Sequence, residues 1–210
     1  MAWRRTAMSE AEIRDAAPVN PPLTKYMFCS PSAGAVALVL ARADRAADLC
    51  DQPIRLAAAA MRSRGHGSFE VYSPSLSIDT GHNVTVDAAA AAFKRAGVEP
   101  GDVRVAQVQD TDSGSEIIHL AETGLCEHGE QTELIASGAT EVDGRLPINT
   151  DGGCIASGEP IGASGLRQVH EVVRQLQGRA PGGQVPGRPE VGFTQVYGAP
   201  GISACTVLTR

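Results

Sequence analysis

The stretch from Asn149 to Gly165 constrains the fold of this chain more than any other part of the sequence. It reads Asn-Thr-Asp-Gly-Gly-Cys-Ile-Ala-Ser-Gly-Glu-Pro-Ile-Gly-Ala-Ser-Gly. Glycine adopts positive φ and lets the backbone approach other groups closely, and the proline after Glu159 stiffens the turn. The stretch therefore predicts a shaped loop that holds Glu159 at a constrained position. A helix is predicted to follow from Ala163 to Gln177, ended by Gly178, with an apolar face made of Leu166, Val169, Val172, Val173 and Leu176.

Charge and composition exclude several functional classes. A net charge of −6 and a pI near 5.4 argue against a general nucleic-acid binder, which carries a basic stripe. No apolar run reaches the roughly 18–20 residues of a membrane helix, and no apolar segment typical of a secretory signal follows the first five residues. We therefore expect a cytoplasmic protein that uses neither a membrane nor nucleic acid. The cysteines are scattered and odd in number, as suits a reducing compartment: Cys29, Cys50, Cys126, Cys154 and Cys205.

The N-terminal third predicts one short helix and two apolar strands. Ser9 and Glu12 have the spacing of a capping box for a helix that ends near Ala16. The chain then looks extended from Leu23 to Cys29. The apolar run Ala35–Ala41 and the segment Ile54–Met61 are both predicted to be strands, the first of them buried.

The rest of the chain alternates between helix and strand patterns. Thr85 or Asp87 is expected to cap a helix that ends at Gly97. Residues 103–108 predict a strand, residues 115–126 a helix, and residues 191–197 and 202–208 a C-terminal hairpin. Alternation of this kind predicts an α/β fold, a mixed sheet layered with helices in the order βαβαβαββ.

Several motifs, taken in order, resemble the thiolase family. Asn149-Thr-Asp-Gly-Gly and Gly158-Glu-Pro-Ile-Gly-Ala-Ser-Gly165 are similar to a family motif that contains Gly-His-Pro-x-Gly. Gln195-Val-Tyr-Gly-Ala-Pro-Gly201 looks like the family's C-terminal Cys-x-Gly-x-x-Gly, and Val105–Asp112 sits where the family has its Asn-Glu-Ala-Phe or His-Asp-Ala-Phe loop. Glu122–Glu130 and Leu146–Thr150 resemble the sterol-carrier or lipid-transfer branch, which includes acetyl-CoA acetyltransferase-like proteins.

The resemblance implies that the chain is a C-terminal half. Residues 1–51 correspond to the end of the family's loop domain and the last strand of its N-terminal half, and residues 52–210 to its C-terminal domain. The family's nucleophilic cysteine lies in the other half. Ser32-Ala-Gly-Ala and the following apolar residues resemble the strand that closes the N-terminal half.

The positions that carry thiolase chemistry are altered. The resemblance places Glu159 where the family has histidine, Val196 where it has the basic cysteine, and Gln109 where it has asparagine or histidine. An ionised carboxylate only accepts hydrogen bonds, so it opposes an oxyanion, and a valine moves no proton. We therefore expect a retro-aldolase-like activity, with Glu159, Tyr197 and Asp110 as catalytic residues and Gly158, Gly162, Gly198 and Gln109 at the substrate.

Each of these residues also has a structural interpretation. Glu159 could cap the following helix, Asp110 and Asp112 could cap the helix after their strand, and Tyr197 could simply pack. Cys29, Cys154 and Cys205 are interpreted as small buried hydrophobes. The spacing Cys126-Glu-His128 lacks a second ligand pair, so no metal site is expected. His66 and His82 lie in a loop where they could meet a ligand or solvent, and His119 and His170 are expected on solvated helix faces or in pairs.

Three functional classes remain open at this point. The chain is the C-terminal half of an acyl-CoA enzyme, a non-catalytic acyl-CoA- or lipid-binding scaffold, or a truncated product. The resemblance implies coenzyme A as the carrier of the substrate and no tightly bound cofactor. It also implies a thiolase N-terminal half or a homo-oligomer as partner, and a small zinc-ribbon/OB-fold protein as a further one.

Overall fold

A mixed four-stranded sheet forms the centre of the molecule. The computed structural model describes residues 5–64, 83–198 and 201–210. The strand order is β3 (Arg55–Ser63), β6 (Ile202–Thr209), β5 (Val191–Gly198) and β4 (Val105–Gln107). β4 runs parallel to β5, whereas β6 is antiparallel to both of its neighbours. The expected mixed sheet and C-terminal hairpin are confirmed.

The third strand of the expected order is reduced to a single bridge. Ile148 pairs in parallel with Ala106 of β4, and Asn149 donates its backbone N–H to the carbonyl of the same alanine at 3.0 Å. The bridge places the start of the glycine-rich stretch beside the end of β4.

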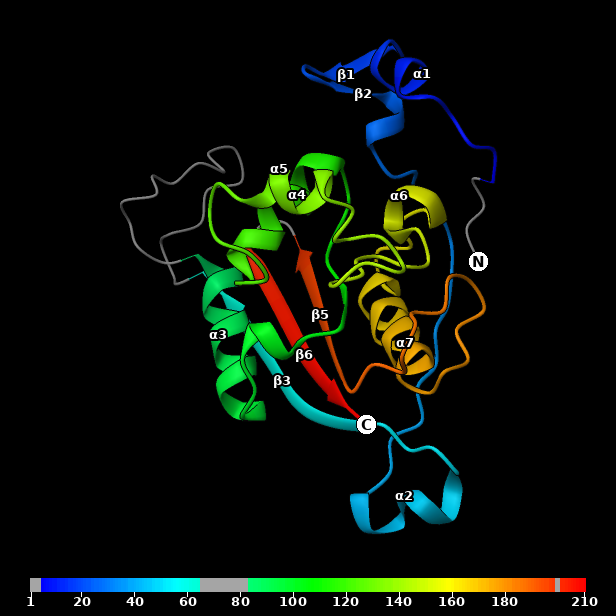
Figure 1. Cartoon of the computed structure of the whole chain (residues 1–210), viewed down its shortest axis with the longest axis vertical. Coiled ribbons are helices and arrows are strands. Elements are labelled where there is room, and N and C mark those ends of the chain that lie inside the picture. Colours follow the sequence, from blue (N-terminus) through cyan, green and yellow to red (C-terminus); the bar gives the residue numbers. More distant parts are fainter. Residues whose placement is uncertain (1–4, 65–82, 199–200) are drawn as a thin grey trace.

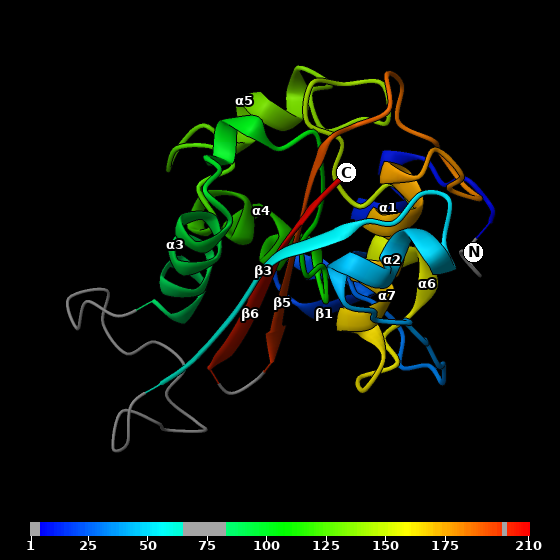
Figure 2. The same cartoon turned by 90° about the horizontal axis from the view of Figure 1, so that it is seen from below.

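Helices cover both faces of the sheet (Figures 1 and 2). α3 (Val84–Ala96) packs against β3 and β6 on one face, and α7 (Ser164–Leu176) packs mainly against β5 and β4 on the other. Small alanines bring α3 close to the sheet, where Phe93 stacks on Phe193 of β5 with ring centroids 4.9 Å apart. This contact lies in the largest apolar core of the molecule.

The helix boundaries follow from local capping. Asn83 caps α3 by accepting from the backbone N–H groups of Thr85 and Val86, and Gly97 ends it with φ of 70°. The expected cap at Thr85 or Asp87 is therefore wrong by two or more residues, because the asparagine just before them supplies the oxygen. The remaining elements on this side are a 3₁₀ turn η3 (Pro100–Asp102), α4 (Ser113–Glu122), α5 (Gln131–Ala136) and α6 (Gly153–Ser157).

The buried face of α7 is more polar than its apolar pattern predicts. Leu166 is 45% exposed, while Gln168, Glu171 and Gln175 are buried. Gln175 donates to Glu171 at 2.9 Å and to the carbonyl of Gly183 at 2.6 Å. The predicted apolar face is thus only partly correct, because these polar side chains find partners in the connector of residues 179–189.

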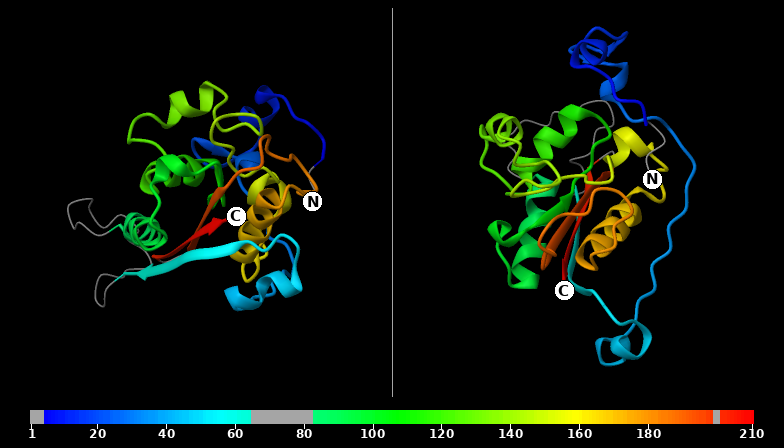
Figure 3. Two further views of the ribbon diagram at one scale, coloured as in Figure 1. Left: turned by 60° about the horizontal axis from the view of Figure 1, so that its bottom comes forward. Right: turned by 45° about the vertical axis from the view of Figure 1, so that its right-hand side comes forward.

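The N-terminal region forms an appendage on this body (Figure 3). The capping box of Ser9 and Glu12 begins α1 as expected. The chain from Leu23 to Cys29 is only partly extended, because a 3₁₀ turn interrupts it. The elements of the region are α1 (Glu10–Arg14), β1 (Pro18–Asn20), β2 (Leu23–Thr24), the 3₁₀ turn η1 (Lys25–Met27) and α2 (Ala43–Leu49).

The prediction of a buried strand at Ala35–Ala41 is wrong for this chain. The run joins no sheet, and Val39 and Leu40 are 93% and 78% exposed. The described part of the chain places no strand beside it, so its backbone groups have nothing to pair with.

The stacked phenylalanines provide a test of the core. We expect Phe193→Ala to lower the free energy of unfolding by about 3–5 kcal/mol, because the ring is fully buried and its removal leaves a cavity. Urea denaturation measures the change. Ile118→Ala is the control, since Ile118 is 53% exposed; equal effects of the two substitutions would contradict the assignment of this core.

Candidate active site

The glycine-rich stretch wraps around the short helix α6. Gly152, Gly153 and Gly158 have φ of 90°, 60° and 79°. A Cβ on Gly153 would lie 2.0 Å from Oδ2 of Asp110, and one on Gly158 would lie 2.6 Å from Oγ of Ser32. Glycine is therefore required here for both its backbone conformation and its lack of a side chain.

The carboxylate of Glu159 lies in a cluster of hydrogen-bond donors. Gln109 Nε2 donates to its two oxygens at 2.8 and 2.9 Å. Ser164 Oγ donates to Oε1 at 2.7 Å and Thr111 Oγ1 to Oε2 at 3.1 Å. Cys29 Sγ lies 3.8 Å from Oε2. We call Glu159, Gln109, Thr111 and Ser164 the Glu159 cluster; its donors come from the loop after β4 and the first residue of α7.

These contacts do not include a backbone cap. No side chain caps the first backbone N–H groups of α7, so Glu159 reaches that helix only through the hydroxyl of Ser164. The expectation that Glu159 caps the following helix is therefore wrong in its usual form. The backbone of Glu159 instead bonds to the N-terminal segment, donating to the carbonyl of Ser30 at 2.8 Å.

Gln109 is buried at the centre of the cluster. Its backbone N–H donates to Gln195 Oε1 at 3.0 Å, and its own Oε1 accepts from Gln168 Nε2 at 3.3 Å. Neighbours on β5 and α7 thus fix its amide so that the NH₂ group faces Glu159. In this structure Gln109 orients the carboxylate.

Asp110 has a structural position directly beneath α6. Its carboxylate accepts the backbone N–H groups of Cys154 at 2.7 Å and Ile155 at 3.0 Å. Burial raises its pKa to about 6, although these two hydrogen bonds oppose the shift. Asp112 caps α4 by accepting from Ser115 N at 2.9 Å. The capping alternative is thus the one observed for both aspartates, except that Asp110 caps α6.

Glu116 is an ionisable residue that the sequence reasoning missed. It lies on α4, where burial raises its pKa to about 7, the charge of Asp110 raises it further, and a hydrogen bond with Asn149 opposes the shift. Nothing in the spacing of α4 separates Glu116 from a surface glutamate. The proximity of Asp110 and Asn149 exists only in the folded chain.

Tyr197 lies on the other face of the sheet from α7. Its ring is 5.5 Å from that of buried His119, whose Nδ1 lies 2.7 Å from Glu122 Oε2. Val196, the preceding residue of β5, faces Gly165 of α7. Because successive strand residues face opposite sides, Tyr197 joins the His119–Glu122 pair and does not join the Glu159 cluster.

The remaining predicted residues fall into three groups. Gly162 and Gly198 are exposed, with open space where a Cβ would be. Cys154 and Cys205 are buried as expected, and burial raises the pKa of each thiol to about 12, which keeps it protonated and a weak nucleophile. His170 is exposed, whereas His66 and His82 lie outside the described residues.

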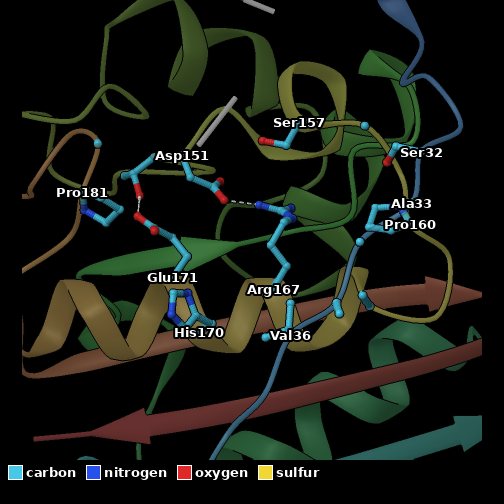
Figure 4. Close-up of a pocket in the computed structure, with 16 residues that line it drawn as sticks. Ser32, Ala33, Val36, Asp151, Ser157, Pro160, Arg167, His170, Glu171 and Pro181 are labelled. Carbon is cyan, nitrogen blue, oxygen red and sulfur yellow. Dashed lines mark hydrogen bonds and ion pairs between the residues drawn. The ribbon is translucent and has the colours of Figure 1, made fainter. Parts of the chain in front are cut away.

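A cavity of about 390 Å³ lies beside the cluster (Figure 4). Gly158 and Pro160 line it on either side of Glu159, and Arg167 and His170 of α7 form its floor. Arg167 is paired with Asp151, and Thr150 donates to Glu171 at 3.0 Å. The polar groups at this floor are therefore engaged with one another.

Within residues 5–64, 83–198 and 201–210, no group of three or more histidine, cysteine, aspartate or glutamate side chains has a metal-binding arrangement. The same residues contain no helix that is long and apolar enough to cross a membrane. The Glu159 cluster therefore offers acid–base chemistry by a carboxylate, and its donors are directed at that carboxylate.

Comparisons with known proteins support these assignments. A family model described as "Thiolase C-terminal domain-like" matches residues 72–210. The chain is 37% identical to an acetyl-CoA acetyltransferase of Methanothermobacter thermautotrophicus, over 95% of this chain and 51% of that protein. It is 37% identical to sterol carrier protein 2 of Gallus gallus, over 81% of this chain and 30% of that protein.

Two further similarities concern carbon–carbon lyases. The chain is 35% identical to the 17-hydroxy-3-oxo-4-pregnene-20-carboxyl-CoA lyase of Mycobacterium tuberculosis, over 76% of this chain and 40% of that protein. A solved structure titled "Ltp2-ChsH2(DUF35) aldolase" superposes with a TM-score of 0.82 at 23% identity, covering 99% of this chain and 53% of that one. The chain spans about half the length of the first two curated relatives it matches.

The raised pKa of Glu116 predicts a pH-dependent stability. The unfolded side chain ionises near 4.5 and the folded one near 7, so the folded state is favoured below pH 4.5 and loses that advantage as the pH rises towards 7. Glu116→Gln cannot ionise. Relative to the variant, the wild type should lose on the order of 2–3 kcal/mol between pH 4.5 and 8.

Urea titrations of both proteins at several pH values measure this difference. Glu127→Gln is the control, because Glu127 is exposed. A stability difference between wild type and Glu116→Gln that stays constant with pH would contradict the assignment.

Proposed function

The chain belongs to the thiolase superfamily, and from this premise we propose that it is the C-terminal half of an assembly that acts on acyl-CoA thioesters. The reaction proposed is the cleavage or formation of a carbon–carbon bond in fatty-acid or sterol side-chain metabolism. Coenzyme A carries the substrate, and the proposal includes no tightly bound cofactor. The two lyase- and aldolase-named neighbours favour aldol-type chemistry over ordinary thiolase chemistry.

The observation that carries the proposal is the Glu159 cluster. Thiolase chemistry needs donors aimed at an oxyanion and a group that moves a proton at carbon. Here the central group is a carboxylate that accepts every bond of the cluster, and Val196 faces α7 without any titratable group. A carboxylate is, however, suited to remove a proton from a hydroxyl.

An aldol cleavage can be written with this one base. Glu159 takes the proton of a β-hydroxyl group, the oxygen electrons form the new carbonyl, and the bond between the α and β carbons breaks. The bonding pair remains on the α carbon as a thioester enolate, which is then protonated. Thr111 is exposed, so its hydroxyl is the cluster donor that a substrate hydroxyl can replace most readily.

The proposal assigns the other residues to binding and positioning. Gly158, Gly162 and Gly198 provide open backbone near the substrate, and Gln109 orients Glu159. Asp110 and Tyr197 are left out of the chemistry, because one caps α6 and the other packs on His119.

The complete assembly needs further polypeptide. We assign residues 1–51 to the end of the loop domain and the last N-half strand, and residues 52–210 to the C-terminal domain. A thiolase N-terminal half, or a homo-oligomer, would complete the fold. The two-component title of the structural neighbour supports an additional zinc-ribbon/OB-fold partner, and we place the protein in the cytoplasm.

A second candidate is a non-catalytic subunit that binds acyl-CoA or lipid. The observation that favours it is the saturation of Glu159, whose two oxygens each accept two hydrogen bonds from the protein itself. A truncated product without an independent role is the third candidate.

Glu159→Gln separates these candidates. In an assembly with the complementary half, the variant should turn over a β-hydroxyacyl-CoA about 100-fold or more slowly, because an amide cannot accept the proton. Initial rates of aldehyde or ketone release measure this, with exposed Glu133→Gln as the control. Unchanged turnover would remove Glu159 from the mechanism, and an assembly that binds the thioester without any turnover would favour the scaffold.

A further inference from the structure

The run Ala35–Ala41 is an extended strand without a sheet. Residues 5–64, 83–198 and 201–210 provide no hydrogen-bond partner for its backbone groups. Its sequence Ala-Val-Ala-Leu-Val-Leu-Ala contains no charged or polar side chain. Strands that are apolar on both faces are typical of sheets covered by layers on both sides.

Both ends of the run are attached to the body. Before it, Cys29 N donates to the carbonyl of Thr111 at 2.9 Å and Ser32 N to that of Glu159 at 3.4 Å. After it, Gln177 of α7 donates to the carbonyl of Gln52 at 2.8 Å. The segment between these anchors passes alongside α7 without lying against the sheet (Figure 3). Its position is therefore determined even though it pairs with nothing.

The body opposite the run is incompletely covered. α7 packs on β4 and β5, which leaves the same face of β3 and much of β6 open. Met61 of β3 is 66% exposed and Ile202 of β6 is 44% exposed on this side. Two strands span about 10 Å, which is the width of one helix. The open strip, defined by Met61 and Ile202, therefore has room for one helix beside α7.

The cavity described above is the space between these two surfaces. Ala33–Val36 form one wall, and Arg167 and His170 of α7 form the other (Figure 4). The strand, the cavity and the open strip thus make one continuous unfilled layer.

We propose that Ala35–Ala41 is a strand of a second sheet whose other strands come from the remaining half of the family's length. A helix of that half lies on the open strip next to α7. The relatives that match this chain over about half of their length contain enough additional polypeptide to supply both. This holds whether that half is covalently continuous with Met1 or separate, and it rests on the proposed function only in requiring a complementary half.

The consequence is that the two halves interlock. The strand belongs to this chain by sequence and to the other half by packing. It also continues directly from the segment that pairs with Glu159. Docking of the other half should therefore fix the position of the Glu159 cluster as well.

A co-expression experiment tests this interlock. The probe is the part of the Methanothermobacter thermautotrophicus acetyl-CoA acetyltransferase that precedes its matched region, captured through a tag on this chain. Wild type and Ile118→Asp, on the exposed side of α4, should retain the probe. Val39→Asp should retain at least tenfold less, because it places a charge in the second sheet. The amides of residues 35–41 should exchange at least 100-fold more slowly in the complex than in the chain alone.

Each other result overturns the proposal. Equal retention by Val39→Asp, unprotected amides in the complex, or no retained probe with wild type would each contradict it. A chain that dimerises alone with these amides protected would assign the strand to a second copy instead. The outcome is separate from that of the proposed function: a protected strand in an assembly without turnover contradicts only the chemistry, and turnover with an unprotected strand contradicts only the interlock.

Discussion

The hydrogen bonds that converge on the Glu159 carboxylate hold the functional end of this molecule together. They join the loop after β4, the first residue of α7 and, through the backbone of Glu159, the N-terminal segment at Ser30 and Ser32. A half-buried carboxylate has to be satisfied by donors, and here four bonds from three side chains supply them. Loss of this one charge would leave a buried amide and two hydroxyl groups without their acceptor.

The close approach of these segments depends on the absence of side chains. Gly153 leaves room for the carboxylate of Asp110 under α6, and Gly158 leaves room for Ser32. The same economy appears in the core, where alanines of α3 allow the helix to lie close to the sheet. The site is therefore built by apposition of backbone, and its few polar side chains fill the remaining space.

Local sequence rules predicted most of the elements and failed where distant residues intervene. The hairpin, α3, α7 and the order of the sheet were predicted because apolar periodicity and glycine positions are local signals. The polar face of α7 was not, because Gln168 and Gln175 are buried only through partners on β4 and the connector after α7. Asp110 and Tyr197 were assigned to one site, yet they lie in different places because strand alternation and the position of α6 separate them from Glu159.

The sequence by itself determined the family, the glycine-shaped loop and the presence of a carboxylate at its centre, since these depend on residue identity and spacing. Only the tertiary structure decided which side chains surround that carboxylate, and it placed Gln109, Thr111 and Ser164 there. It also decided that Ala35–Ala41 remains unpaired. A run of apolar residues specifies the tendency to form a strand, but hydrogen bonding in a sheet requires a neighbouring strand, and the described part of this chain does not provide one.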